Sequence, residues 1–274
     1  MRNLTIATLA AAIAVPAQAA PTPVPAVQST ITYSRTATGA SGFGNHARAT
    51  STVVYDPVTD CYTVRDTGNL AIKSSFGPAN IDAGASGAAF TVYTKAGAGS
   101  VETLRKLNAG AGNPLIALNY VTYGQWRRST TSGPTTSVND TYVVWGSKTA
   151  TTPTTGTGSY STVLDGTFAN ASGVYAVTGS GTLTANFGAG SIAYGATASG
   201  AREGGGTGIS FGTMIGSGTI AYASAGFSGT GSTNGSGYRL DLAGNFYGPA
   251  AQEIGGTFRI RGNGGNGTGA IVGQ

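Results

Sequence analysis

One stretch decides the fold of this chain: Gly244-Asn245-Phe246-Tyr247-Gly248-Pro249-Ala250-Ala251-Gln252-Glu253-Ile254-Gly255-Gly256-Thr257-Phe258. It predicts two β-strands joined by a short connection, with the second strand continuing through Ile260 and Arg261. The proline ring fixes φ near −65° and suits the first position of a helical turn, so we expect Pro249 to begin a turn that residues 250–252 complete. We interpret the whole stretch as the hairpin that closes a small β-barrel.

The distinctive residues of this stretch are expected to serve the fold. Glu253 is expected to accept hydrogen bonds from backbone N–H groups that the turn leaves free. Paired glycines inside a strand predict a bulge, or a place where an aromatic side chain such as Phe246 or Tyr247 lies across bare backbone. The structural motif therefore consists of Gly244, Phe246, Gly248, Pro249, Glu253, Gly255, Gly256 and Phe258.

Upstream of this hairpin, short segments alternate apolar and polar residues with a period of two. Leu183, Ala185 and Phe187 share one face of a segment, and the residues between them are polar. This pattern predicts antiparallel strands with one buried face, and eight strands suit a closed barrel that has no exposed edge. The eight predicted segments are Gly158–Ser161, Tyr175–Val177, Thr182–Phe187, Ser191–Tyr194, Gly208–Phe211, Thr219–Tyr222, Tyr238–Leu242 and Thr257–Arg261.

The first half of the chain predicts a second, smaller β unit. Residues 50–66 predict a hairpin with its turn at Asp56-Pro57, and residues 90–93 predict another strand. Residues 101–107 carry apolar side chains at helical spacing and predict a short helix, with a strand as the close alternative. Residues 115–126 are rich in β-formers, and residues 129–139 predict a polar loop.

The composition agrees with an all-β chain. Of 274 residues 46 are Gly, and only 9% are charged. Fourteen glycines fall in residues 1–150 and 32 in residues 151–274, so the two halves are built differently. The formal net charge is +5, but the basic residues are dispersed. Nucleic-acid binding needs a concentrated basic face, and we therefore predict no nucleic-acid partner.

Residues 1–19 are typical of a secretory signal peptide. Arg2 precedes an Ala-rich apolar run, and Ala17-Gln18-Ala19 fits a small-residue cleavage site. The run is too short to span a bilayer. No cysteine adjoins the cleavage site, so we predict an exported protein without a lipid-modified N-terminus, held at the outer-membrane surface, in the periplasm or released.

The hairpin at 244–258 resembles the β-barrel domain of transferrin-binding protein B and related bacterial surface proteins. Residues 182–190 and Pro153–Gly156 ahead of Tyr160 share the resemblance, and residues 50–126 resemble more weakly the handle domain that precedes such barrels. The resemblance implies a handle-like β domain at 20–140 followed by a closed eight-stranded antiparallel barrel at 141–274. It also implies non-enzymatic binding of an iron- or haem-carrying host protein, and it transfers no functional residue.

Two motif matches lack the context that their chemistry requires. Gly208-Ile209-Ser210-Phe211-Gly212 fits the Gly-x-Ser-x-Gly pattern of hydrolases, which needs a following helix together with histidine and acidic partners. Gly262–Gly267 fits the Gly-x-Gly-x-x-Gly pattern, which needs a βαβ unit. We interpret the first as a coincidence in a Gly/Ser-rich sequence and the second as a terminal turn.

The candidate ligand-binding residue is His46, the only histidine. Its ordinary interpretation is a surface-loop histidine, and the sharper one is an axial haem ligand. One histidine and one cysteine, Cys61, predict no metal cluster, and Cys61 is expected to pack in a strand. Tyr120, Tyr123 and Trp126 are either partner anchors or, as we favour, packing in the handle. No cofactor and no catalytic residue are predicted.

Three functions remain open at this point. The first is an exported binding protein of the bacterial envelope whose ligand is an unknown protein or a haem- or iron-containing molecule. The second is an integral outer-membrane barrel, because period-two alternation also describes membrane strands. The predicted strands are shorter than the 9–11 residues that span a bilayer, and this favours the first. The third is a Gly-rich structural or adhesive surface protein.

Overall fold

A computed structural model describes residues 27–36, 39–40, 45–48, 51–56, 58–66, 68–233, 235 and 237–274, with the side chains described from Val53 onward. The predicted signal peptide lies outside these residues. The strands before the barrel are β1 (Val27–Thr36), β2 (Gly39–Ala40), β3 (Asn45–Arg48), β4 (Ser51–Asp56), β5 (Cys61–Asp66), β6 (Ile72–Phe76), β7 (Phe90–Gly97), β8 (Ser100–Leu107), β9 (Val121–Ser132) and β10 (Thr135–Gly146).

The strands of the barrel are β11 (Thr157–Asn170), β12 (Gly173–Asn186), β13 (Ser191–Arg202), β14 (Ile209–Ala221), β15 (Gly226–Thr233), β16 (Arg239–Tyr247), β17 (Glu253–Gly262) and β18 (Gly265–Gly273). Two 3₁₀ turns, η1 (Pro78–Asn80) and η2 (Tyr222–Ser224), are the helical elements of the described residues. Within those residues no helix has the length and apolar character needed to span a membrane.

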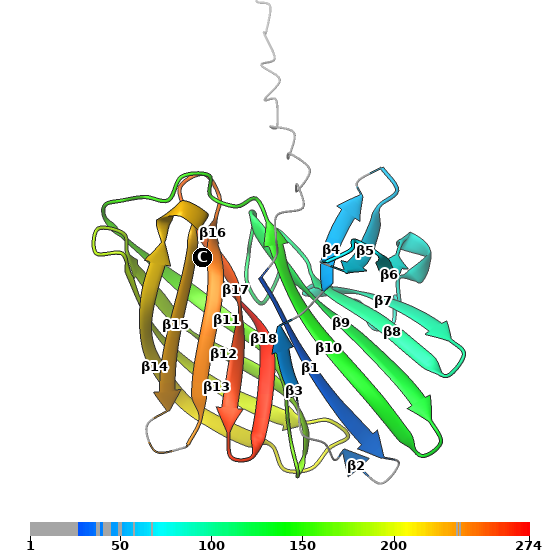
Figure 1. Cartoon of the computed structure of the whole chain (residues 1–274). Coiled ribbons are helices and arrows are strands. Elements are labelled where there is room, and N and C mark those ends of the chain that lie inside the picture. The colour runs from blue at the N-terminus through cyan, green and yellow to red at the C-terminus, as the bar shows by residue number, and fades with distance from the viewer. Residues whose placement is uncertain are drawn as a thin grey trace, which may run out of the picture.

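The strands form three units side by side (Figure 1). The handle sheet has the order β2-β1-β10-β9-β8-β7, with β3 also pairing with β1. The small sheet, β4-β5-β6, lies on one side of the handle sheet, and the closed barrel β11–β18 lies on the other. The predicted fold class, all-β with a closed eight-stranded antiparallel barrel, is confirmed.

The handle sheet is buried on both faces, and this explains why residues 101–107 form strand β8 and not the predicted helix. Leu104 and Leu107 are three residues apart, so in a strand they point to opposite faces. Leu104 packs with Tyr62 and Phe76 of the small sheet, whereas Leu107 belongs to the cluster that faces the barrel. Burial on both faces of β8 therefore explains why its apolar residues are three positions apart, a spacing that is also typical of a helix.

The barrel has eight strands, as predicted, but they are distributed differently. The predicted segments 175–177 and 182–187 are both parts of β12, and 208–211 and 219–222 are both parts of β14. Strands β15 and β18 were not predicted. The glycines at 262–267, interpreted as a terminal turn, connect β17 to β18. Closure is made by β18, which pairs with both β17 and β11, and not by the hairpin at 244–258.

Strand β10 crosses the boundary expected between residues 140 and 141. It pairs with β1 and β9 in the handle sheet, and the barrel begins at Thr157. The predicted polar loop at 129–139 is the tip of the β9–β10 hairpin, where the strands continue to Ser132 and resume at Thr135. Threonine and serine side chains are compatible with strands that project into solvent, so polarity alone did not mark a loop.

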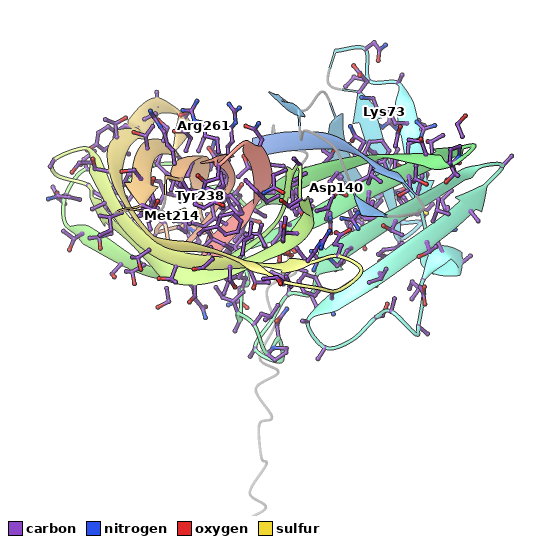
Figure 2. All side chains as sticks on the ribbon, turned by 90° about the horizontal axis from the view of Figure 1, so that it is seen from below. Lys73, Asp140, Met214, Tyr238 and Arg261 are labelled. Atoms are coloured by element: carbon purple, nitrogen blue, oxygen red, sulfur yellow. The ribbon has the colours of Figure 1, made fainter. Side chains whose placement is uncertain are left out.

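Side chains fill the barrel interior. At one end Phe168, Phe211 and Tyr238 pack edge to face, with ring centroids 5.0–5.8 Å apart. At the other end Phe187 and Phe227 pack on Phe246, with centroids 5.2 and 5.3 Å apart. Aliphatic residues and Met214 fill the space between these groups, and Figure 2 shows Met214 and Tyr238 inside the wall. An eight-stranded barrel is narrow enough for side chains to fill it.

Candidate binding surface

The hairpin at 244–258 joins the barrel to the handle. Glu253, the first residue of β17, is buried, and its carboxylate accepts backbone N–H bonds from Asn119, Tyr120 and Val121 at 2.6, 2.8 and 2.9 Å. As predicted, Glu253 accepts hydrogen bonds from backbone N–H groups. The donors are not in the adjacent turn, as expected, but at the start of β9 and in the two residues before it. The connection at 248–252 is a tight turn and not a helical one.

The paired glycines lie at the contact between the hairpin and the handle. A Cβ on Gly255 would come within 2.6 Å of Val121, 2.8 Å of Val144 and 3.1 Å of the Tyr247 ring. A Cβ on Gly256 would instead meet the backbone of Ala243 at 2.3 Å. The β16–β17 register is continuous through both glycines, so there is no bulge. Gly255 is the position at which the predicted close approach of an aromatic ring occurs.

Two ion-pair groups also connect the handle to the barrel. In the first, Arg105 of β8 donates to both oxygens of Asp165 in β11 at 2.8 and 2.6 Å. The Tyr123 hydroxyl donates to the same carboxylate at 2.6 Å. Burial lowers the pKa of Arg105, but the Asp165 carboxylate, with Tyr142 and Tyr123, raises it, and the net pKa lies above the ordinary value. Burial, and then Asp165, raise the pKa of Tyr123.

The second group is centred on Asp140, which is fully buried between the handle sheet and the barrel (Figure 2). Arg127 donates to both Asp140 oxygens at 2.7 and 2.8 Å, and to Glu203 of the barrel at 2.8 Å. Thr167 of β11 donates to Asp140 at 3.0 Å. In both groups a handle side chain is bonded to a barrel side chain, so we assign the two groups to holding the two units together.

The outer side of β12–β15 has a different character. Its exposed side chains are mainly short hydroxyls, and we call this surface the free wall. Its hydroxyl residues are Thr178, Ser180, Thr182, Thr184, Thr197, Ser199, Ser210, Thr213, Ser217, Thr219, Ser228, Thr230 and Ser232. From 166 to 238 the sequence contains two charged residues, Arg202 and Glu203, and both lie at the end of this wall.

Strand pairing arranges the hydroxyls of the free wall in rows across the strands. Thr178 is opposite Ser199, which is opposite Ser210, and the next row joins Ser180, Thr197 and Thr213. The Thr197 and Thr213 hydroxyls are hydrogen-bonded at 3.0 Å. A shallow hollow lies over these two rows, and its lining includes the residues between them, Gly179 and Ala198. This surface was not predicted from the sequence, although residues 166–238 form a long stretch with only two charges.

The other predicted residues take structural positions or remain untested. The backbone of His46 lies in β3, opposite Ile31 of β1, but its side chain is outside the described part, so the haem-ligand hypothesis stays a prediction. Tyr123 and Trp126 are buried, which agrees with packing. Cys61 is partly buried and unpaired, and its Sγ lies 3.4 Å from the Thr59 carbonyl oxygen.

Neither catalytic motif has its required surroundings. Ser210 is exposed on β14, which continues as a strand to Ala221, so no helix follows the Gly-x-Ser-x-Gly match. Among the side chains that the structure describes, no group of three His, Cys, Asp or Glu residues could hold a metal ion.

Comparison with solved structures returns transferrin-binding and lactoferrin-binding proteins. One is transferrin-binding protein B of Haemophilus parasuis, with 18% identity, a TM-score of 0.45, and coverage of 84% of this chain and 45% of that chain. The chain resembles transferrin-binding protein B. The resemblance predicted from residues 244–258 is thus confirmed, while no family model and no curated protein matches the sequence.

Two further matches cover nearly the whole of a shorter structure. Transferrin-binding protein B of Actinobacillus pleuropneumoniae has 13% identity, covers 91% of this chain and 100% of that chain, and has a TM-score of 0.42. The N-lobe of lactoferrin-binding protein B of Moraxella bovis has 14% identity, coverage of 90% and 99%, and a TM-score of 0.41. Against the longer structure the chain spans less than half the length. None of these likenesses assigns a ligand to this chain.

Proposed function

We propose that this chain is an exported, non-enzymatic binding protein of the bacterial envelope that presents the free wall to a protein partner. One observation carries the proposal: a broad, uncharged hydroxyl surface with a shallow hollow is held by a barrel whose other side is fixed to the handle. Short serine and threonine side chains lose little conformational freedom when a partner covers them. Hydroxyls both donate and accept hydrogen bonds, which suits adaptable recognition.

The packing of the barrel favours its outer surface as the binding site. Aromatic groups close both ends, and the interior between them is filled. A ligand in the interior would have to displace these side chains, and truncating a buried Phe costs about 3–5 kcal/mol. The outer surface needs no such rearrangement.

The outward residues of β12–β15 also disfavour the integral membrane barrel. A strand that faces lipid carries an apolar band on its outer side, whereas the exposed side chains of the free wall are mostly hydroxyls, with Ile215 as a large apolar exception, and most apolar residues point inward. Strand length does not separate the two functions, contrary to the prediction, because the barrel strands are 8–14 residues long. The direction of the side chains therefore distinguishes the two functions where strand length did not.

The partner class to test first is a host protein that carries iron or haem, following the resemblance to transferrin-binding protein B. His46 is the candidate for direct haem binding, and it makes a separate prediction. If His46→Ala binds free haem as tightly as the wild type, or if the wild type binds none, haem coordination by His46 is wrong. The His46 result does not bear on the free wall, which is tested by a separate experiment.

The experiment uses two charge-introducing variants in the hollow, Thr178→Lys and Ser199→Lys, which face each other across β12 and β13. Purified chain without residues 1–19 is titrated with transferrin, lactoferrin, haemoglobin and free haem by biolayer interferometry. The matched control is Ser137→Lys, because Ser137 is an exposed hydroxyl on handle strand β10. We expect the wild type to bind one of these partners and each wall variant to weaken binding at least tenfold, with the control unchanged.

Two results would contradict the proposal. In one, both wall variants bind the partner as the wild type does, which would move the site to another surface. In the other, Ser137→Lys weakens binding as much as the wall variants do, which would place the site on the handle. Circular dichroism of each variant checks that the fold is intact.

A further inference from the structure

A second surface of the barrel has the opposite character to the free wall. Three arginines, Arg239 of β16 and Arg259 and Arg261 of β17, lie on the outward side of these neighbouring strands together with Asp241. The register places Arg239 opposite Arg261 and Asp241 opposite Arg259. Figure 2 shows Arg261 on the outside of the wall, away from Met214 and Tyr238. We call these four residues the arginine patch.

The patch contains more positive charge than its carboxylate can neutralise. Asp241 is shared, because Arg239 contacts one of its oxygens at 3.1 Å and Arg261 the other at 2.8 Å. Arg259 donates to the amide oxygen of Asn266 at 2.8 Å. From 239 to 274 the sequence has only one other acidic residue, Glu253, and its carboxylate is engaged by the backbone before β9.

The neighbouring handle strands do not supply the missing negative charge. Strands β1, β9 and β10 lie against β17 and β18, β1 also lies against β16, and β3 lies against β18. The Asp140 carboxylate of β10 is already bound by Arg127. Residues 27–48, which include β1 and β3, contain no Asp or Glu and three basic residues: Arg35, His46 and Arg48. Strands β1 and β3 therefore bring no acidic residue to the patch.

Two guanidinium groups of the arginine patch also have N–H donors that make no hydrogen bond to the described residues. The Nε atoms of Arg259 and Arg261 are buried and have no hydrogen-bond partner among the described residues. Desolvation, and then the charge of Arg261, lower the pKa of Arg259, while Asp241 raises it. By contrast, Arg105 and Arg127 at the junction each bind a carboxylate through two bonds.

We propose that the arginine patch binds a phosphate-type oxyanion, with Arg259 and Arg261 as its principal ligands. A tetrahedral anion offers several acceptor oxygens to planar guanidinium forks, and such charge-assisted bonds are strong. A phosphate between the two β17 side chains would offset their mutual repulsion as well as form bonds. Its source is either a free phosphate compound or the headgroup of an anionic lipid, and both share this chemistry.

The test measures binding of inorganic phosphate and pyrophosphate by calorimetry, and sedimentation with vesicles of phosphatidylglycerol or of phosphatidylcholine. Arg259→Gln and Arg261→Gln are each expected to weaken binding about tenfold, the effect of losing bonds to a charged group. Asp241→Asn should tighten it severalfold, because the competing carboxylate is removed. The matched control is Arg128→Gln, an exposed arginine on β9 of the handle, and it should bind as the wild type does.

The outcomes separate the two sources. Binding of phosphate or pyrophosphate with this variant pattern indicates a soluble ligand. Binding only to phosphatidylglycerol vesicles, with the same pattern, indicates a lipid headgroup and so a membrane-facing side of the barrel. The proposal is overturned if the wild type binds none of the anionic probes. It is also overturned if Arg128→Gln weakens binding as much as Arg259→Gln, since the effect would then be net charge alone.

Discussion

The two sides of the barrel wall are built from one repeated hairpin pattern but have different surfaces. The side formed by β11 and β16–β18, which we call the handle wall, carries the buried Glu253 and Tyr247 and the partly buried Asp165 against the handle sheet. The free wall carries exposed hydroxyls and almost no charge. Both walls share one apolar interior, so the inward residues do not distinguish them.

The difference between the two walls shows where the few charged residues of this chain lie. With 9% charged residues, it places carboxylates where they meet specific donors of the handle, at the junction between the units. A buried carboxylate with defined partners fixes one orientation and is costly to misplace. Hydroxyls on the free wall impose no such requirement, which leaves that surface available to a partner.

The largest effect is expected from Glu253→Gln. The change removes the negative charge and turns part of the side chain into a donor facing three backbone N–H groups. We expect a loss of about 3 kcal/mol in the free energy of unfolding, measured by urea denaturation. The control is Glu102→Gln, which affects a longer pair with the half-exposed Arg128 and should cost less than about 1 kcal/mol. Equal losses in both variants would refute a special role for Glu253.

A pair of glycine substitutions tests the walls directly. Gly255→Val should destabilise by about 2 kcal/mol, because the added side chain would overpack the contact with Val121, Val144 and Tyr247. Gly195 on the free wall has no atom within 4 Å of an added Cβ, and Gly195→Val should be neutral or stabilising because valine favours strands. Thermal unfolding of the two variants in parallel measures the change in stability at each position. If Gly195→Val is the more harmful, the walls do not differ as described.

Buried tyrosines predict a fall in stability at alkaline pH. Burial raises the pKa of Tyr247 and of Tyr160 to about 12, above about 10 for an unfolded chain. Between these values the unfolded chain loses the proton and the folded chain keeps it. Stability is therefore complete below pH 10 and falls as the pH rises towards 12, by up to about 1.4 kcal/mol per pH unit for each tyrosine.

Urea unfolding at pH 9, 10 and 11 measures this slope. Tyr247→Phe on the handle wall should make the fall in the free energy of unfolding with pH less steep, because one of the two tyrosines no longer contributes to it. The double variant Tyr247→Phe, Tyr160→Phe should make the fall less steep still. A slope that is the same in the wild type and the double variant would contradict the assignment.

The smallest effect on stability is expected on the free wall. Thr178→Lys and Ser199→Lys should each change the free energy of unfolding by no more than about 0.5 kcal/mol, as is usual for exposed positions. The same denaturation experiment measures it. A loss above about 1 kcal/mol in either variant would mean that the free wall is covered or constrained in the folded chain.

The sequence was sufficient to predict the fold class because period-two alternation and turn residues are local signals. Strands β4, β5, β7, β16 and β17 were all recognised from such patterns. Strand β18 was missed because its small residues, Gly265 to Gly273, resemble a flexible tail. They are in fact buried against neighbours: an added Cβ on Gly269 would come 2.2 Å from the Asp165 carbonyl oxygen. Glycine here reports close packing, which composition cannot distinguish from flexibility.

The junction could not be predicted for a different reason. Glu253 binds the backbone of residues that precede it by more than 130 positions, and Arg105 finds Asp165 across the two units. Neither pairing leaves a local pattern. The free wall did leave one, the run from 166 to 238 with two charges, but a neutral surface is recognisable only when the structure shows which side of each strand faces outward.

The pairing of β18 with β11 has a consequence for how the chain folds. Val272 of β18 pairs with Val163 of β11, so the barrel closes only after the intervening strands are in place. Contacts between such distant residues form slowly, because the entropy of a long loop must be lost first. Until then β11 has an unpaired edge, the kind of edge on which other chains add strands. The step most exposed to aggregation is therefore the interval before closure, and assistance during that interval would matter more than added stability in the finished barrel.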